Sequence, residues 1–195
     1  MMIIRLVVLA VTLVGAAFAG AATWALDPPH TAVQFSVRHM MVSNVRGEFT
    51  KLTGSVEGDE AKPTEAVITV NIDPASLNTR DAKRDEHLRG PDFFDVAKYP
   101  AITFKSKSIA AAGPGAFKVT GDLTMHGVTK EIVLDVSDVT PAITDPSGKT
   151  RAGARATTKL DRKDFGINWS KAMDNGGLVV GEEVAVTVDV EAVKQ

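Results

Sequence analysis

The densest group of side chains that could perform acid–base chemistry is the run Arg84-Asp85-Glu86-His87. A general acid–base pair needs a carboxylate and an imidazole within hydrogen-bond reach of a substrate. On that hypothesis Asp85 and His87 would serve a hydrolase or isomerase that acts on a lipid. No nucleophile elbow or triad motif accompanies them, and we assign no catalytic residue. The favoured interpretation is that the charged residues of this run form ion pairs that hold a covering segment over the barrel. The alternative is that Arg84, Asp85 and His87 contact a ligand head group.

The histidines give no metal-binding motif. They are His30, His39, His87 and His126. None stands in a short-range pair such as H-x-x-x-H, and the chain has no cysteine, so we predict no metal site. His39 continues the alternation of Val33, Phe35 and Val37, which directs it inward. There it either closes the core through a hydrogen bond or contacts a ligand head group.

The first 22 residues resemble a targeting signal. Arg5 is their only charge, an apolar run follows over residues 6–14, and small residues at 17, 19 and 21 fit cleavage. We therefore predict a cleaved signal peptide over residues 1–22, export to the periplasm, and one domain over residues 23–195. A retained membrane anchor is the alternative. Without cysteine, the exported domain must be stabilised by its core rather than by disulfides.

The charge of the mature chain argues against a nucleic-acid partner. Removing Arg5 with the signal leaves 21 basic and 24 acidic residues, a net charge of −3. Nucleic-acid binding would require a basic surface stripe instead.

Alternating apolar and polar residues predict eight strands bounded by Gly, Pro, Asn or Asp clusters. They cover residues 31–40, 45–56, 65–72, 101–109, 116–125, 129–136, 151–160 and 182–193. The alternation slips between Phe49 and Leu52, which predicts a bulge or bend, and His126-Gly127 resembles a hairpin turn. We expect an all-β fold, an eight-stranded antiparallel lipocalin-like barrel without exposed edges. A two-sheet sandwich is the alternative.

Two segments interrupt this pattern. Residues 73–99 are predicted to form one or two short helices with loops that cover one end of the barrel, and residues 161–181 form the second interruption, anchored by Trp169 and Met173. Phe93, Phe94 and Tyr99 in the first segment either complete the core or line an entrance.

The inward faces of several predicted strands carry small residues, as in the row Ala152, Ala154 and Ala156 and at Gly121 beside Leu123. A barrel lined in this way need not fill its interior. We therefore predict a long apolar cavity. Its expected lining residues are Phe35, Val37, His39, Phe49, Ile68, Val70, Phe94, Phe104, Gly121, Leu123, Ala152, Ala154, Ala156, Trp169 and Val186.

Motifs along the whole mature chain resemble the YceI family. They are S-V-R-H-M-M-V-S-N-V-R-G-E-F at 36–49, R-D-x-H-L at 84–88, F-F-D at 93–95, Y-P-x-I-x-F at 99–104, G-D-L-T-M-H-G-V-T at 121–129 and D-F-G at 164–166. This resemblance implies a lipocalin-like barrel, periplasmic or secreted and often dimeric, that holds a polyisoprenoid or similar long apolar molecule.

Binding energetics favour a long tail over a compact metabolite. A prenyl unit contributes roughly 3 to 4 kcal/mol, at about 0.8 kcal/mol per CH₂, while association costs on the order of 4 to 15 kcal/mol. We therefore expect an exported, non-enzymatic binding protein for sequestration, storage or transfer of an isoprenoid or fatty lipid. We expect no cofactor other than the lipid ligand. The expected interactions are with this lipid, transiently with a membrane, and with a second copy of the chain in a homodimer. A regulatory partner of a membrane protein, such as a quinone-linked cytochrome, is a further alternative.

Overall fold

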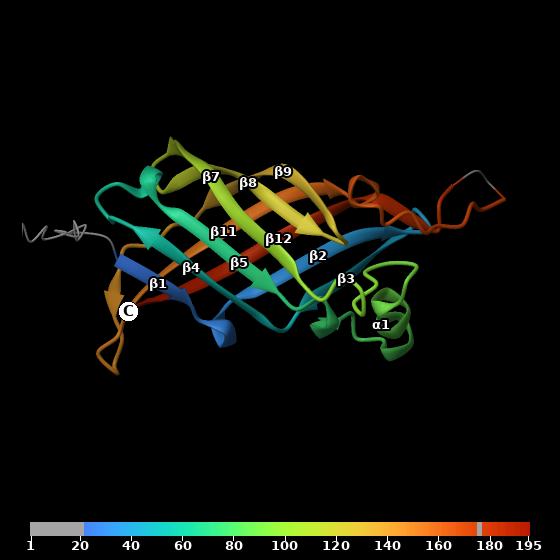
Figure 1. The fold of residues 1–195 in the computed structure, drawn as a ribbon, viewed down its shortest axis with the longest axis horizontal. Helices are drawn as coiled ribbons and strands as arrows, with labels where there is room; N and C mark the ends of the chain where they lie inside the picture. Colours follow the sequence, from blue (N-terminus) through green and yellow to red (C-terminus); the bar gives the residue numbers. More distant parts are fainter. Residues whose placement is uncertain (1–21, 175–176) are drawn as a thin grey trace, which may run out of the picture.

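The computed structural model describes residues 22–174 and 177–195, which form a closed antiparallel β-barrel with one short helix at one end (Figure 1). The predicted fold class is therefore confirmed. The proposed signal peptide lies outside the described residues except for Ala22. That residue already pairs with Gly58, so the barrel begins one residue earlier than expected.

The eight barrel strands of the described chain are built from ten of its strand segments. β1 (Ala22–Leu26) and β2 (Ala32–His39) share one barrel strand, and β3 (Ser43–Phe49) and β4 (Leu52–Gly58) share the next. The other six barrel strands are β5 (Val67–Ile72), β7 (Ile102–Gly113), β8 (Ala116–Met125), β9 (Val128–Ser137), β11 (Thr150–Asp161) and β12 (Val180–Lys194). The short strands β6 (Leu77–Asn78) and β10 (Ile143–Thr144) pair with β3 and β11.

The last strand closes the barrel. One edge of β12 pairs with β11 from Glu183 to Val193, and the other pairs first with β2 and then with β1. Because β12 pairs with both the first barrel strand and β11, the described sheet closes on itself, which protects most of the strand edges that promote aggregation in open sheets.

The slip in alternation between Phe49 and Leu52 marks a real break. β3 ends at Phe49 while paired with β2, and β4 starts at Leu52 and pairs with β1 and β5. The neighbouring barrel strand has a corresponding break between β1 and β2, at the 3-10 turn η1 (Pro28–His30). β1 gives no separate signal in the sequence, because Ala22–Leu26 directly follows the apolar leader.

The β8–β9 hairpin uses the predicted two-residue turn. His126 and Gly127 have φ values of 53° and 76°, as a type I′ turn requires. A β-carbon on Gly127 would lie 2.5 Å from the Tyr99 ring, so this glycine also allows Tyr99 to pack closely.

The segment between β5 and β7 covers one end of the barrel, as predicted. It contains η3 (Pro74–Ser76), β6 and the helix α1 (Ala82–Arg89), which lies at the end of the barrel in Figure 1. The second interrupting segment begins with η4 (Arg162–Phe165), in which Arg162 and Phe165 are buried. No helix within the described ranges is long and apolar enough to cross a membrane.

A belt of packed side chains fills the middle of the barrel, contrary to the expected continuous cavity. Its buried members come from six strands and are Leu26, Val33, Leu52, Phe104, Leu123 and Ala156. Gly121 does not open space there, because a β-carbon on it would lie 2.5 Å from both Phe104 Cζ and the Lys105 carbonyl oxygen. Likewise the Phe35 ring packs against Gly47. These glycines accommodate neighbouring rings rather than a ligand.

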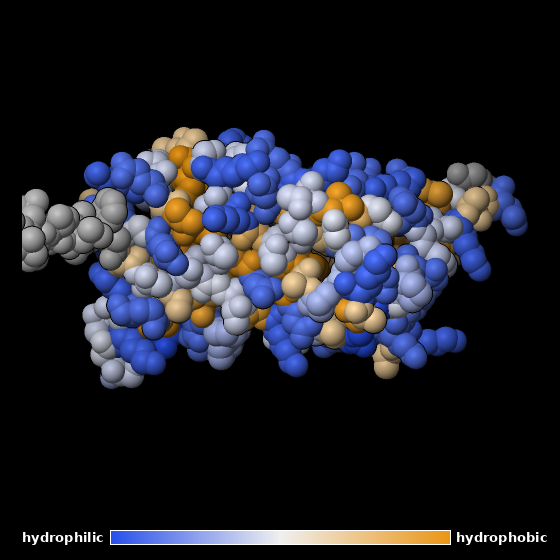
Figure 2. All heavy atoms as spheres, in the orientation of Figure 1, coloured by the Kyte–Doolittle hydropathy of each residue, from blue (hydrophilic) through white to orange (hydrophobic). Residues whose placement is uncertain are grey.

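The outer surface is largely polar. Figure 2 shows hydrophilic residues over most of one face, with hydrophobic residues visible in patches between them. Apolar side chains on the inner face of a closed barrel and polar ones outside agree with the alternation found in the sequence.

Candidate ligand-binding site

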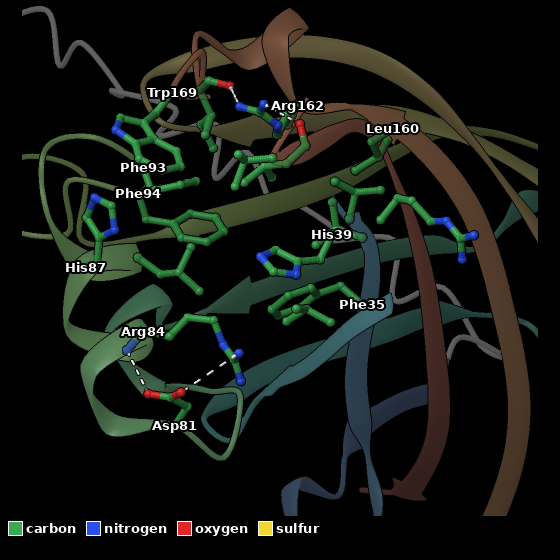
Figure 3. Close-up of a pocket in the computed structure, with 18 of the residues that line it drawn as sticks. Phe35, His39, Asp81, Arg84, His87, Phe93, Phe94, Leu160, Arg162 and Trp169 are labelled. Carbon is green, nitrogen blue, oxygen red and sulfur yellow. Dashed lines mark hydrogen bonds and ion pairs between the residues drawn. The ribbon is translucent and has the colours of Figure 1, made fainter. Parts of the chain in front are cut away.

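A cavity of about 660 Å³ lies between the belt and α1 (Figure 3). Its walls come from β2, β3, β12, the segment 160–169 and the covering segment. Most of its lining is apolar: Phe35, Val37, Val45, Phe49, Leu88, Phe93, Phe94, Met125, Leu160, Ile167, Trp169, Val179, Val180, Val184 and Val186. The polar lining residues are Arg38, His39, Asp81, Lys83, Arg84, Glu86, His87 and Arg162. We call this space the mouth cavity.

The helix α1 is held by capping and by anchors at its two ends. Asp81 accepts a hydrogen bond from the backbone N–H of Arg84 at 3.1 Å, which satisfies one of the unpaired donors of the first turn. This bond lowers the pKa of Asp81 below its usual value. At the other end, Arg89 Nε donates to the Ala75 carbonyl at 2.8 Å. A helix this polar therefore stays in place through specific bonds rather than through an apolar face.

Asp85 is a structural residue, which agrees with the interpretation favoured from the sequence and not with the alternative of a head-group contact. Its carboxylate is buried and accepts hydrogen bonds from Thr79 N at 2.9 Å and Thr79 Oγ1 at 2.5 Å. Asp85 is not part of the cavity lining. Both bonds fall on Oδ1 and tie this carboxylate to Thr79, and its position outside the cavity lining argues against a role as general base for a ligand in the cavity.

Arg84 and His87 do line the mouth cavity, as predicted for the head-group region. Arg84 Nε also donates to Thr79 Oγ1 at 2.7 Å, so it supports the same anchor as Asp85. The His87 imidazole lies 2.8 Å from Asp92 Oδ2, so its carboxylate partner is Asp92 rather than Asp85. Of the acid–base pair considered from the sequence, only His87 lines the cavity.

Aromatic rings join the covering segment to the barrel wall. Trp169 packs edge-on against His87 at 5.0 Å between ring centroids and against Phe93 at 5.2 Å. Phe94 packs against Phe49 at 5.6 Å. These residues complete the core and line the cavity together, so both interpretations of Phe93, Phe94 and Trp169 are correct. Tyr99 instead packs on His126, with centroids 4.5 Å apart, and lies outside the cavity lining.

The inward direction predicted for His39 is confirmed. His39 pairs with Val180 across the β2–β12 ladder, and its side chain lines the mouth cavity (Figure 3). Phe35, Val37, Phe49 and Val186 share that cavity, as predicted.

The remaining predicted lining residues lie elsewhere. Ile68, Ala152 and Ala154 line a second cavity of about 400 Å³ at the opposite end, together with Trp24 and Phe117. Another five line neither cavity, because they belong to the packed middle of the barrel or adjoin it: Val70, Phe104, Gly121, Leu123 and Ala156. The row of alanines on β11 therefore faces a different space from the aromatic cluster.

Several lining residues were missed. Leu160 and Val184 continue the inward alternation of their strands, so the same rule that found Val186 also identifies them. Arg162 gave no such signal, because a charged residue after a strand is ordinarily assigned to the surface.

One group of three potential metal ligands occurs within the described residues: Asp27, His30 and Glu191. A guanidinium nitrogen of Arg151 lies 2.5 Å from Asp27 Oδ2 and 2.6 Å from Glu191 Oε1. Hydrogen bonds from His30 and Arg151 lower the pKa of Asp27. The guanidinium therefore already supplies the positive charge that a metal ion would bring, and we assign no metal site.

Comparison with known proteins fits this geometry. The family model for the YceI-like domain matches residues 24–192. The chain belongs to the YceI-like family. A UPF0312 protein of Vibrio cholerae is 41% identical over 151 residues, which cover 76% of this chain and 79% of that protein.

Solved structures share the barrel of this YceI-like chain. The Campylobacter jejuni YceI protein superposes with a TM-score of 0.68 and 32% identity, covering 80% of this chain and 89% of that one. A polyisoprenoid binding domain from Saccharophagus degradans gives a TM-score of 0.65 at 18% identity, covering 88% and 98%. The resemblance seen in the sequence motifs is therefore confirmed.

Proposed function

We propose that this YceI-like protein is an exported, non-enzymatic binding protein that holds the tail of a long-chain lipid, isoprenoid or fatty, in the mouth cavity. The observation that carries the proposal is a cavity of about 660 Å³ with an apolar wall and polar residues grouped on α1. Apolar cavities with a few placed polar groups are typical ligand sites. The polyisoprenoid binding ascribed to the Saccharophagus degradans domain supports the same ligand class.

The cavity volume sets the length of tail that fits. If a carbon takes about the volume of a liquid water, ~30 Å³, then 660 Å³ holds about 20 carbons, or about four prenyl units. Burying these carbons contributes about 16 kcal/mol, at about 0.8 kcal/mol each, which exceeds the association cost of about 4 to 15 kcal/mol. A longer tail would extend beyond the mouth, because the belt separates this cavity from the second one.

The biological task that fits such a site is shielding a lipid from water for sequestration, storage or transfer. Asp85 lies outside the lining of the mouth cavity, which favours a binding protein over a hydrolase or isomerase that would use this residue. The apolar leader with its small-residue cleavage pattern supports export to the periplasm. The proposal includes a homodimer, as the sequence resemblance implies.

Filling the mouth cavity should abolish most lipid binding. Val37→Trp combined with Val186→Trp places two indoles in the wall of this cavity. We expect at least tenfold less long-chain lipid per mole of protein in an organic extract of the purified variant, quantified by mass spectrometry.

Ala154→Trp is the matched control, because it fills the second cavity and leaves the mouth cavity unchanged. It should retain the wild-type lipid content. The proposal is wrong if wild-type protein is repeatedly empty and takes up no added lipid. It also fails if both variants lose lipid equally while remaining folded.

The proposal extends to a transient membrane contact through the β2–β3 hairpin. Met40, Met41 and Val42 at its tip are 44%, 55% and 76% exposed. Met40 N donates to the carbonyl of Val179, a lining residue, at 2.9 Å, so the tip adjoins the mouth cavity. Exposed apolar side chains at the opening of a lipid site suit contact with a bilayer surface.

Acidic substitutions in this hairpin should weaken vesicle binding. We expect Met41→Asp with Val42→Asp to reduce co-sedimentation with phosphatidylglycerol/phosphatidylcholine vesicles several-fold. Ile143→Asp removes a similarly exposed apolar residue, 63% exposed on β10, and should have no effect. Equal sedimentation of all three proteins would exclude the hairpin as the contact.

A further inference from the structure

Arg162 is a buried cation in the wall of the mouth cavity. Its side chain is only 4% exposed and lines the cavity (Figure 3). It follows β11 at the start of η4, and its guanidinium reaches the beginning of β12. A charged group with so little access to water requires strong local compensation.

Among the described residues, the hydrogen-bond partners of this guanidinium are neutral backbone carbonyls. Nε donates to the Gly181 carbonyl at 2.9 Å, and the two terminal nitrogens donate to the carbonyls of Ile167 at 2.6 Å and Val180 at 3.3 Å. A guanidinium has five N–H groups, so these three bonds leave two for another acceptor.

No carboxylate of the described chain forms an ion pair with Arg162. Asp161 and Glu182 are the acids that act on it electrostatically; Asp161 accepts the backbone N–H of Lys163, and Glu182 forms an ion pair with the Lys163 ammonium. Burial lowers the pKa of Arg162, which reflects the unfavourable loss of hydration of its charge. Within the described residues, therefore, the positive charge of Arg162 is balanced by these two acids only at a distance, and no carboxylate contacts it directly.

We propose that Arg162 binds the anionic head group, a carboxylate or a phosphate monoester, of the lipid whose tail fills the mouth cavity. The planar guanidinium matches the geometry of both anions. Other cations lining the cavity are Arg38, Lys83 and Arg84, and the acids are Asp81 and Glu86. Two histidines, His39 and His87, also line it. The inference rests on the proposed function, because it requires a lipid in this cavity.

A set of ligands with the same tail tests the proposal on the wild-type protein. Hexadecanoic acid, monohexadecyl phosphate and 1-hexadecanol differ only in their heads. Their dissociation constants can be measured at pH 8 by tryptophan fluorescence, since Trp169 lines the cavity. We expect at least one of the two anions to bind at least tenfold more tightly than the alcohol, and their order identifies the preferred head.

The outcomes separate this inference from the proposed function. If acid, phosphate and alcohol bind with equal affinity, the head-group inference is overturned and the lipid-binding function stands. If none of the three binds and no lipid co-purifies, the proposed function itself fails.

Substitution of Arg162 tests whether this residue is the source of the preference for anionic head groups. Arg162→Gln should reduce the preference for anions, measured as the ratio of anion to 1-hexadecanol affinity in the same variant, to about twofold. Arg162→Lys, which keeps a charge but loses the planar fork, serves if the Gln variant fails to fold, and should lower the preference several-fold. Lys163→Gln removes the adjacent exposed charge outside the cavity lining and should retain the wild-type preference.

An anion preference that survives in the folded Arg162 variants overturns the assignment. If His39→Gln loses the preference for anions and the Arg162 variants keep it, His39 on β2 contacts the head group instead of Arg162.

Discussion

Asp85→Ala should destabilise the protein by about 3 kcal/mol. The substitution leaves the N–H and hydroxyl of Thr79 without their acceptor in a buried setting, and each hydrogen bond to a charged group contributes about 1.5–3 kcal/mol. Thr79 is also the partner of Arg84, so the anchor of α1 is lost as a unit. The free energy of unfolding from urea titration measures the loss.

Asp92→Ala is the matched control for this anchor. It removes the carboxylate that pairs with His87, and both side chains are about half exposed. Exposed pairs contribute about 1 kcal/mol or less, so this variant should remain close to the wild type. Equal losses in the two variants would contradict the structural role assigned to Asp85.

Gly121→Val should be more damaging, with a loss of at least about 3 kcal/mol, because overpacking that displaces backbone exceeds the usual 1–3 kcal/mol. A β-carbon at this position would lie 2.5 Å from the Lys105 carbonyl oxygen on β7 and from the Phe104 ring. The added side chain must therefore push β7 away from β8 or displace a belt residue. We expect little soluble protein and a lowered urea midpoint in whatever folds.

Ala154→Val provides the comparison, because its added methyl groups enter the second cavity rather than the belt. Its free energy of unfolding should change by less than about 1 kcal/mol. If Gly121→Val were as stable as Ala154→Val, the belt would not be packed as described.

The barrel could be predicted because its information is local. Alternation along β2, β5 and β12 gives each strand its inward face, and the turn residues His126 and Gly127 fix a hairpin register. β1 could not be separated from the leader, since both are short apolar or small-residue runs. The two-residue strands β6 and β10 are too short to carry a periodic signal.

The site was predictable only in part, because a small residue on an inward face can either border a cavity or allow a neighbouring side chain to pack closely. Ala154 lines the second cavity, whereas Gly121 on β8 leaves room for the Phe104 ring on the neighbouring strand β7. The choice depends on cross-strand neighbours, which the linear sequence does not specify. The same limit applies to the charged residues Asp85 and Arg162. Asp85 accepts hydrogen bonds from Thr79, whereas Arg162 lines the cavity.

The pairing of β1 with β12 has a consequence for how the chain is made. A ribosome adding about 5–20 residues/s needs roughly 10–30 s to pass from Ala22 to Lys194. Throughout that interval the nascent chain lacks the partner that closes its sheet. Contacts between sequence-distant segments also form slowly. The nascent polypeptide therefore cannot close its barrel until the residues of β12 have emerged from the ribosome.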